Sequence, residues 1–181
     1  DDYEPLDEIR FVTDVAVRLA SLPGAIAVFN PGGELLLDPE RIRGIRTRED
    51  EGGELCVNAF ANVRMFRPEI DPDEPWMLFD SVGMGQVDLQ DHEAAAPAGS
   101  CEASTVAGLV YSMAEYDLER GGVVGPRDTA TDLDDGFWRA RVDGDSLLEP
   151  PRPVLRWFPD GAEVPEMLLG RDDGDAPPSS Q

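Results

Sequence analysis

The sequence predicts an α+β fold, with a mostly antiparallel sheet of about six strands and two main helices packed on one face. Two helical segments, residues 6–20 and 100–120, are interleaved with six or seven short strand patterns, several of them joined by loops of hairpin length. The strict strand–helix–strand alternation of a doubly wound fold is absent, and so is its glycine fingerprint.

The first segment predicts a helix that ends at a proline. Between residues 6 and 20 the apolar side chains recur at the three- and four-residue spacing of an amphipathic helix. Leu22, Pro23 and Gly24 follow. They end a helix because proline cannot continue the hydrogen-bond ladder and glycine accepts a positive φ.

A hairpin and a short helix are predicted next. Residues 25–29 and 34–37 have strand composition and flank a turn of asparagine, proline and two glycines. A two-stranded hairpin is marginal alone, so we expect it to lie beside other strands or under a helix. Residues 39–48 predict a short helix that carries Arg41, Arg43, Arg46 and Arg48.

Two longer strands are predicted in the middle of the chain. Residues 55–65 alternate in the period of two that is typical of a strand with unlike faces. The apolar run at residues 76–79 begins a second, buried strand, and the proline- and acid-rich residues between the two predict a loop. We therefore expect these strands to be antiparallel neighbours, with a crossover connection as the alternative, and the segment after Gly83 and Gly85 to be a polar loop.

The second main helix follows that loop. Residues 100–120 present one broad apolar face, with Ser100 as a candidate N-cap and two glycines at the C-terminal end. Beyond it, short strands are predicted at residues 123–124, 137–142 and 154–158.

One domain is expected. A chain of 181 residues buries enough surface for a single core without a metal or a disulfide. Residues 171–181 have the acidic, proline- and serine-rich composition of a disordered tail. We therefore expect a single α+β domain over residues 1–170.

The charge is the unusual property of the composition. The chain has 38 acidic side chains and 15 basic ones, all arginine, so its net charge is −23. This field repels phosphates, which disfavours nucleic acid and anionic membranes as partners. Solubility and genome composition account for the acidity, or it serves to attract a basic protein partner. Both explanations stay open, and the oligomeric state is not predicted.

The cysteines and the hydropathy bear on location. Cys56 and Cys101 are 45 positions apart and belong to no metal-ligand pattern, so two buried free thiols are the favoured state, and a single disulfide is the alternative for an exported protein. No apolar run reaches the length of a membrane span, and no signal-peptide pattern is visible. We expect a soluble, cytoplasmic protein.

Four residues are candidates for catalysis: Asp80, Asp91, His92 and Glu93. The only histidine lies between two carboxylates, which suits a general base with an orienting acid or part of a metal site, whereas a histidine with a structural role in a loop is the favoured alternative. Neighbouring side chains of a strand point to opposite faces, so only a turn would bring the three together. Asp80 follows four large apolar residues, where a carboxylate is either desolvated for acid–base chemistry or accepts backbone hydrogen bonds.

No strong catalytic motif accompanies these candidates. The acidic turns at residues 132–136 and 143–145 superficially resemble calcium loops but lack the full ligand spacing, and they are interpreted as solvated turns. The serines have no nucleophile-elbow context, and the paired glycines lack the lysine of a phosphate loop. We therefore expect neither a metal nor a cofactor.

A group of short motifs resembles an uncharacterised bacterial family, a domain of unknown function. They are Asp80-Ser81-Val82-Gly83-Met84, Leu89-Gln90-Asp91-His92-Glu93, a helix with Ala114 and Tyr116 that ends at Gly121-Gly122, and Pro151-Arg152-Pro153-Val154. The resemblance covers residues 76–155 and implies a small bacterial α+β domain. It implies no activity, cofactor or catalytic residue.

Two functions from different classes are expected. The first is a non-catalytic protein-interaction or accessory domain whose acidic loops form a binding surface. The alternative is a small hydrolase or metal-dependent enzyme centred on Asp80, Asp91, His92 and Glu93.

Overall fold

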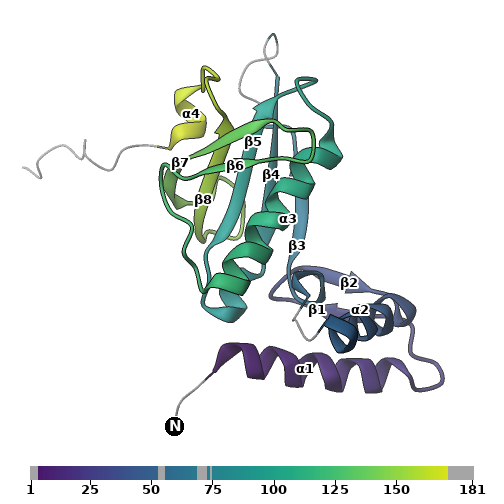
Figure 1. The fold of residues 1–181 in the computed structure, drawn as a ribbon. Coiled ribbons are helices and arrows are strands. Elements are labelled where there is room, and N and C mark those ends of the chain that lie inside the picture. Colours follow the sequence, from purple (N-terminus) through teal and green to yellow (C-terminus); the bar gives the residue numbers. More distant parts are fainter. Residues whose placement is uncertain (1–3, 53–55, 69–72, 74, 171–181) are drawn as a thin grey trace, which may run out of the picture.

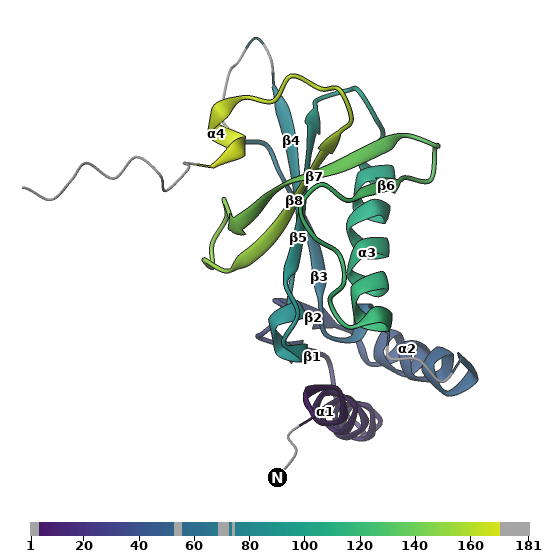
Figure 2. The same cartoon turned by 60° about the vertical axis from the view of Figure 1, so that its left-hand side comes forward.

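The structure, a computed structural model, describes residues 4–52, 56–68, 73 and 75–170, and has an α+β fold. A six-stranded sheet with one long helix on it forms the larger part, here called the sheet part (Figures 1 and 2). A two-stranded sheet with two helices forms a smaller part at one end, here called the N-terminal part. The expected tail at residues 171–181 lies outside the described residues.

The six-stranded sheet is mixed, not mostly antiparallel. In spatial order its strands are β3 (Asn62–Phe66), β4 (Trp76–Val82), β5 (Asp91–Pro97), β8 (Pro153–Pro159), β7 (Phe137–Asp145) and β6 (Thr129–Thr131). β5 and β8 run parallel at the centre, while the other neighbouring pairs are antiparallel. The parallel pair arises because the chain passes through the long helix and the β6–β7 hairpin before it returns beside β5.

The helix α3 (Ala103–Arg120) covers one face of this sheet. Its apolar side chains Val106, Leu109 and Val110 share a core with residues from β4, β5, β7 and β8. Gly121 ends the helix in the left-handed conformation, at φ 80°. The helix begins after Glu102, and Ser100 hydrogen-bonds the carbonyl of Pro97 instead of capping it.

The N-terminal part has a core of its own. It comprises α1 (Pro5–Ala20), β1 (Val28–Asn30), β2 (Leu35–Leu37) and α2 (Pro39–Gly52). Its apolar core continues into the sheet part through the 3₁₀ helices η1 (Val57–Ala59) and η2 (Met84–Val87). The expected hairpin and both helices are confirmed here. The packing of α1 on the sheet is not confirmed, since α1 contacts α2 and η2.

Three local predictions are wrong, each for a physical reason. Residues 55–65 are not one strand: η1 precedes β3, because the N–H groups of Ala59, Phe60 and Ala61 donate to carbonyls three or four residues earlier instead of to a neighbouring strand. Residues 91–93 begin β5 instead of forming a loop, and this strand shows no alternation because it is buried on both faces. Residues 123–124 lie outside the strands, because the Val124 N–H donates to the side chain of Asp117 instead of to a neighbouring strand. The edge strand β6 and the short helix α4 (Glu166–Leu169) were not predicted.

In the part of the chain that the structure describes, no helix is both long enough and apolar enough to cross a membrane.

Gly33 marks where the N-terminal part meets the sheet part. A Cβ added at Gly33 would lie 2.0 Å from the carbonyl oxygen of Phe60, a backbone atom that cannot move aside alone. Replacement by alanine should therefore destabilise the protein by about 2 kcal/mol or more. Urea unfolding measures this change.

Gly44→Ala is the matched control for this substitution. A Cβ at this helical position meets no atom within 4 Å. The alanine variant should be as stable as the wild type or more stable by up to about 1 kcal/mol, because alanine favours helix. Equal unfolding midpoints for Gly33→Ala and the wild type would contradict the close contact with Phe60.

Candidate functional site

The four residues that the sequence singled out are all buried. Asp80, His92 and Glu93 have no exposed surface, and Asp91 is 3% exposed. Asp80 lies in β4 and the other three begin β5. As expected for a strand, His92 points to the opposite side of the sheet from its neighbours. Asp80 is therefore separated from His92 by the sheet.

A row of four charged residues crosses the sheet. The register pairs Arg64 on β3 with Asp80 on β4, Asp80 with Glu93 on β5, and Glu93 with Arg156 on β8. Residues that are paired directly across strands point to the same face, so the two carboxylates lie between two guanidinium groups. We call these four residues the charged row. It faces away from α3.

Asp80 is shared by two arginines. Arg64 Nε donates a hydrogen bond of 3.1 Å to its Oδ1, and Arg152 from the loop before β8 donates to its Oδ2. The hydrogen bond to Asp80 raises the pKa of Arg64. Arg64 also reaches Glu34 of the N-terminal part at 2.8 Å. Both oxygens of Asp80 are therefore occupied by guanidinium groups of the chain itself.

Asp91 joins this network through Arg152. Arg152 Nε donates to Asp91 Oδ2 at 3.1 Å, and Ser81 Oγ donates to Oδ1 at 2.8 Å. The backbone N–H groups of Gly83 and Met84 also donate to this carboxylate. Burial nevertheless raises the pKa of Asp91 above its ordinary value, against the lowering by Ser81 and Arg152. Asp91 holds the start of η2 against the end of β4.

Glu93 and Arg156 form a fully buried ion pair, with 2.6 Å between Oε2 and Nε. The second oxygen of Glu93 accepts hydrogen bonds from Ser146 Oγ and from the Leu147 N–H. Arg156 donates its remaining groups to the carbonyls of Leu168 in α4 and Asp145 in β7. The pair thus fastens the β7–β8 loop and α4 to the sheet.

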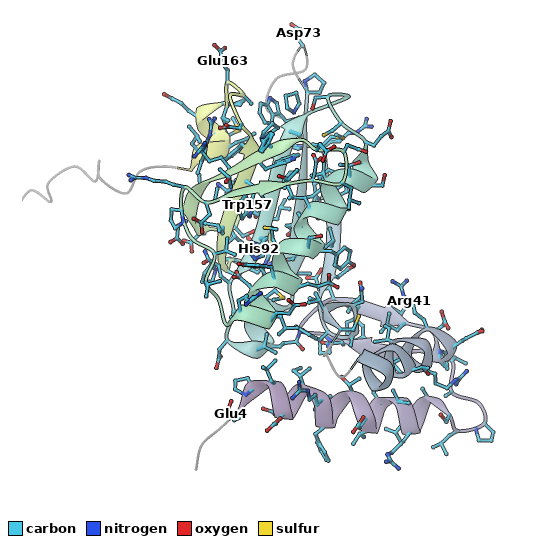
Figure 3. The ribbon with its side chains drawn as sticks, in the orientation of Figure 1. Glu4, Arg41, Asp73, His92, Trp157 and Glu163 are labelled. Carbon is cyan, nitrogen blue, oxygen red and sulfur yellow. The ribbon has the colours of Figure 1, made fainter. Side chains whose placement is uncertain are left out.

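His92 makes its contacts on the α3 side. Its Nδ1 accepts a hydrogen bond from Trp157 Nε1 at 3.2 Å, so Nδ1 carries no proton. Its Nε2 lies 3.2 Å from Asp117 Oδ2 on α3, but the angle is not that of a hydrogen bond. Figure 3 shows His92 and Trp157 within the sheet part, away from α1. The histidine is packed between sheet and helix, with no exposed atom.

The four candidate residues are poorly arranged for metal binding or for proton transfer. Among the described residues, no three His, Cys, Asp or Glu side chains are grouped as a metal ion needs. The carboxylates of the charged row face arginines, and the imidazole lies on the other side of the sheet. The geometry supports stabilisation of the fold more directly than proton transfer.

The sequence analysis did not identify five residues that contact the four candidates: Arg64, Asp117, Arg152, Arg156 and Trp157. One signal was available. Arg156 interrupts the apolar run of β8 as Asp80 ends that of β4, and a charge within such a run indicates a buried partner. Their pairing partners depend on strand register, which no local pattern gives.

The acidic turn at residues 132–136 is held by its own side chains. Burial alone would raise the pKa of Asp132, but hydrogen bonds from Trp138 Nε1 and from the N–H groups of Gly136 and Asp134 outweigh it and lower that pKa. The segment is a turn, as predicted, but Asp132 is held by groups of the chain instead of being only solvated. In the second acidic segment, residues 143–145 belong to β7.

The comparisons with known proteins identify one family model. Residues 80–158 match a family described as a domain of unknown function (DUF4261). The predicted resemblance to an uncharacterised family is thereby confirmed. The match spans β4 to β8, including Asp80, Glu93 and Arg156 but not Arg64. The chain has no significant match among curated proteins or solved structures.

Loss of one member of the Glu93–Arg156 pair should leave a buried charge without its partner. Glu93→Leu and Arg156→Met should each lower the free energy of unfolding by about 3–5 kcal/mol. The double variant removes both charges, so it should be more stable than the sum of the single effects predicts, by at least about 1 kcal/mol. Urea unfolding of the four proteins measures this coupling.

The exposed pair Arg139–Asp160, at 2.9 Å, is the control for that cycle. Arg139→Met and Asp160→Leu should change stability little, since solvent screens this pair. If the buried and exposed cycles gave the same coupling, Glu93 and Arg156 would not be paired in a buried site.

Asp91 and Asp132 predict opposite pH dependences. The folded state favours protonated Asp91, so this residue contributes most below the ordinary carboxyl pKa of about 4, and its contribution decreases as the pH rises through the raised pKa. Asp132 has a lowered pKa, so its contribution is present above the ordinary pKa and is lost as the pH falls through the lowered value.

Unfolding in urea between about pH 3 and pH 7 separates the two effects. The stability of the wild type minus that of Asp91→Asn should decrease as the pH rises. The same difference for Asp132→Asn should increase. Slopes of the same sign for the two variants would refute the assignment for one of the carboxylates.

Proposed function

We propose that the chain is a non-catalytic protein-interaction domain that binds a basic protein partner through an acidic surface. One observation carries the proposal: the side chains of the four candidate catalytic residues are at most 3% exposed. Their polar atoms face the chain's own arginines, serines, backbone amides and tryptophan. A substrate needs access to at least one of them.

The alternative enzyme receives less support from the same geometry. A general base must come within hydrogen-bond reach of a substrate proton, and His92 has no exposed atom on the α3 side. Asp80 and Glu93, on the other side of the sheet, are paired with Arg64, Arg152 and Arg156. A hydrolytic site here requires the opening of several ion pairs.

The acidic charge is unevenly distributed along the sequence. Residues 5–48 contain six acidic residues and six arginines, and are neutral overall. The rest of the chain contains 32 acidic residues and nine arginines, and so carries the whole net charge of −23. Within this rest, residues 56–170 contain 22 acidic residues and eight arginines, so the sheet part carries the larger share of the net charge. We therefore assign the acidic binding surface to the sheet part.

Exposed acids lie at both ends of α3 and in the turn at residues 132–136. Thr105 near the start of α3 donates to Asp134 Oδ2 at 2.7 Å, which holds the turn against the helix. Glu102, Glu119 and Asp135 are exposed on these two elements. Figure 2 shows α3 on the outer side of the sheet. We assign the partner-binding surface to this face.

A cytoplasmic location is part of the proposal. Cys56 and Cys101 are not joined in a disulfide, which agrees with a reducing compartment.

Affinity capture tests the proposed function. The immobilised chain is incubated with bacterial lysate at about 50 mM salt, and the captured protein is then purified and titrated at low and high salt. We expect a basic protein whose binding weakens as salt screens the charges. Capture that is indifferent to salt, or that retains no basic protein, would contradict the proposal.

Two matched triple variants locate the surface. Glu102→Gln, Glu119→Gln and Asp135→Asn together should weaken binding about tenfold, since each lost exposed pair contributes roughly 0.5 kcal/mol. The control triple, Asp88→Asn, Glu163→Gln and Glu166→Gln, removes the same charge from exposed positions off α3 and its turn. Equal loss in both triples would assign binding to net charge alone and refute the α3 surface.

A further inference from the structure

The helix α1 has an exposed apolar stripe on the side opposite its packed face. Its packed face buries Ile9, Thr13 and Ala20. The exposed stripe consists of Phe11 (69% exposed), Val12 (51%), Val15 (39%), Leu19 (57%) and Leu22 (58%), just beyond the helix end. We call these five residues the α1 stripe.

The α1 stripe has the spacing of a helix-packing surface. Phe11, Val15, Leu19 and Leu22 follow one another at intervals of four, four and three residues, which places them along one line of the helix. At a rise of about 1.5 Å per residue the line is roughly 16 Å long. A contiguous apolar surface of this kind is typical of an interface.

α1 lies at the margin of the molecule. In Figures 1 and 2, α2 and β1 lie on one side of it, and no described element lies on the other side. The whole N-terminal part is enriched in such exposure. Residues 5–48 hold half of the large apolar side chains that are exposed in the described residues, though they form about a quarter of the chain.

The small charge of this region is compatible with a second copy of the chain as the partner. Residues 5–20, which form α1, contain three acidic residues and two arginines, so this face carries too little charge to attract a basic partner or to repel a second acidic copy strongly. The charges of the sheet part act weakly over more than a Debye length of about 8–10 Å in physiological salt. A second copy of the chain can therefore approach α1 without strong repulsion.

We propose that two copies of this chain pair through the α1 stripe, with their helices antiparallel. A two-fold axis near Val15 places Phe11 of one copy beside Leu19 of the other, so the stripe meets itself. The flank of the stripe carries Asp14 and Arg18 one turn apart. The same axis brings Arg18 of one copy toward Asp14 of the other, which makes the flank self-complementary in charge.

Sedimentation equilibrium of the full chain from about 1 to 100 µM tests the pairing. The wild type should be dimeric in this range, with a dissociation constant that rises less than tenfold between low and high salt, because only the flanking Arg18–Asp14 contacts are screened. Phe11→Asp with Leu19→Asp should weaken dimerisation at least tenfold, because it places four carboxylates in the apolar interface. Circular dichroism and thermal unfolding of the dilute variant confirm that it is folded.

The control variant carries the same added charge elsewhere. Leu133 and Phe137 are 77% and 67% exposed on the sheet part, and their double replacement by aspartate should leave the dimer intact. A wild type that stays monomeric at 100 µM would overturn the proposal. So would a dimer that survives Phe11→Asp with Leu19→Asp, or one that both double variants weaken equally.

A charge exchange tests the antiparallel arrangement. Asp14→Arg and Arg18→Asp should each weaken the dimer, because each brings like charges together across the two-fold axis. The two changes combined should restore it. Single variants that dimerise like the wild type would overturn the arrangement. The salt dependence of the dissociation constants distinguishes the two proposals. Raising the salt concentration dissociates the basic partner and leaves the dimer in place.

Discussion

Glu93 and Arg156 form an ion pair at 2.6 Å with neither side chain exposed, at the parallel junction between β5 and β8. Two buried charges are costly unless every remaining polar atom is also satisfied, and here they are: the other oxygen of Glu93 holds the β7–β8 loop, while Arg156 holds carbonyls of β7 and α4. The pair therefore constrains strand register, since a slip of one residue would turn the charges into opposite apolar faces. Arg64 and Asp80 extend the same constraint to the edge strand β3.

This interaction also changes how the candidate site is understood. Asp80, Asp91 and Glu93 are the polar residues that tie the sheet to the segments covering one of its faces, and His92 with Trp157 and Asp117 occupies the other face beneath α3. The histidine and the two carboxylates beside it in sequence thus lie in two separate environments in the structure. Because all four residues are buried, the outer surface of the protein is a better candidate for its function than a reaction centre at these residues.

That surface is divided in two. Residues 56–170, which contain the sheet part, hold 22 acidic residues and eight arginines, with exposed acids on α3 and the adjoining turn, whereas residues 5–48 are neutral and expose apolar side chains on α1. Charge governs attraction, specificity and salt response, while apolar area supplies affinity that salt does not weaken. The two proposed contacts, with a basic partner and with a second copy, therefore use different surfaces and different physical interactions.

Local patterns determined a good part of the fold. Helical spacing gave α1, turn chemistry gave the β1–β2 hairpin, and apolar runs gave β4 and β8, because each depends on residues near one another in sequence. The residues of η1 belong to a segment that alternates like a strand, and β5 is buried on both faces, so neither shows the period of its backbone. The sequence by itself determined that Asp80 and Arg156 interrupt apolar strands and that residues 5–48 are neutral. Only the tertiary structure decided that β5 and β8 lie parallel with Glu93 against Arg156, and that His92 lies on the far side of the sheet. Such pairings depend on register between segments about 60 residues apart, which no local pattern specifies.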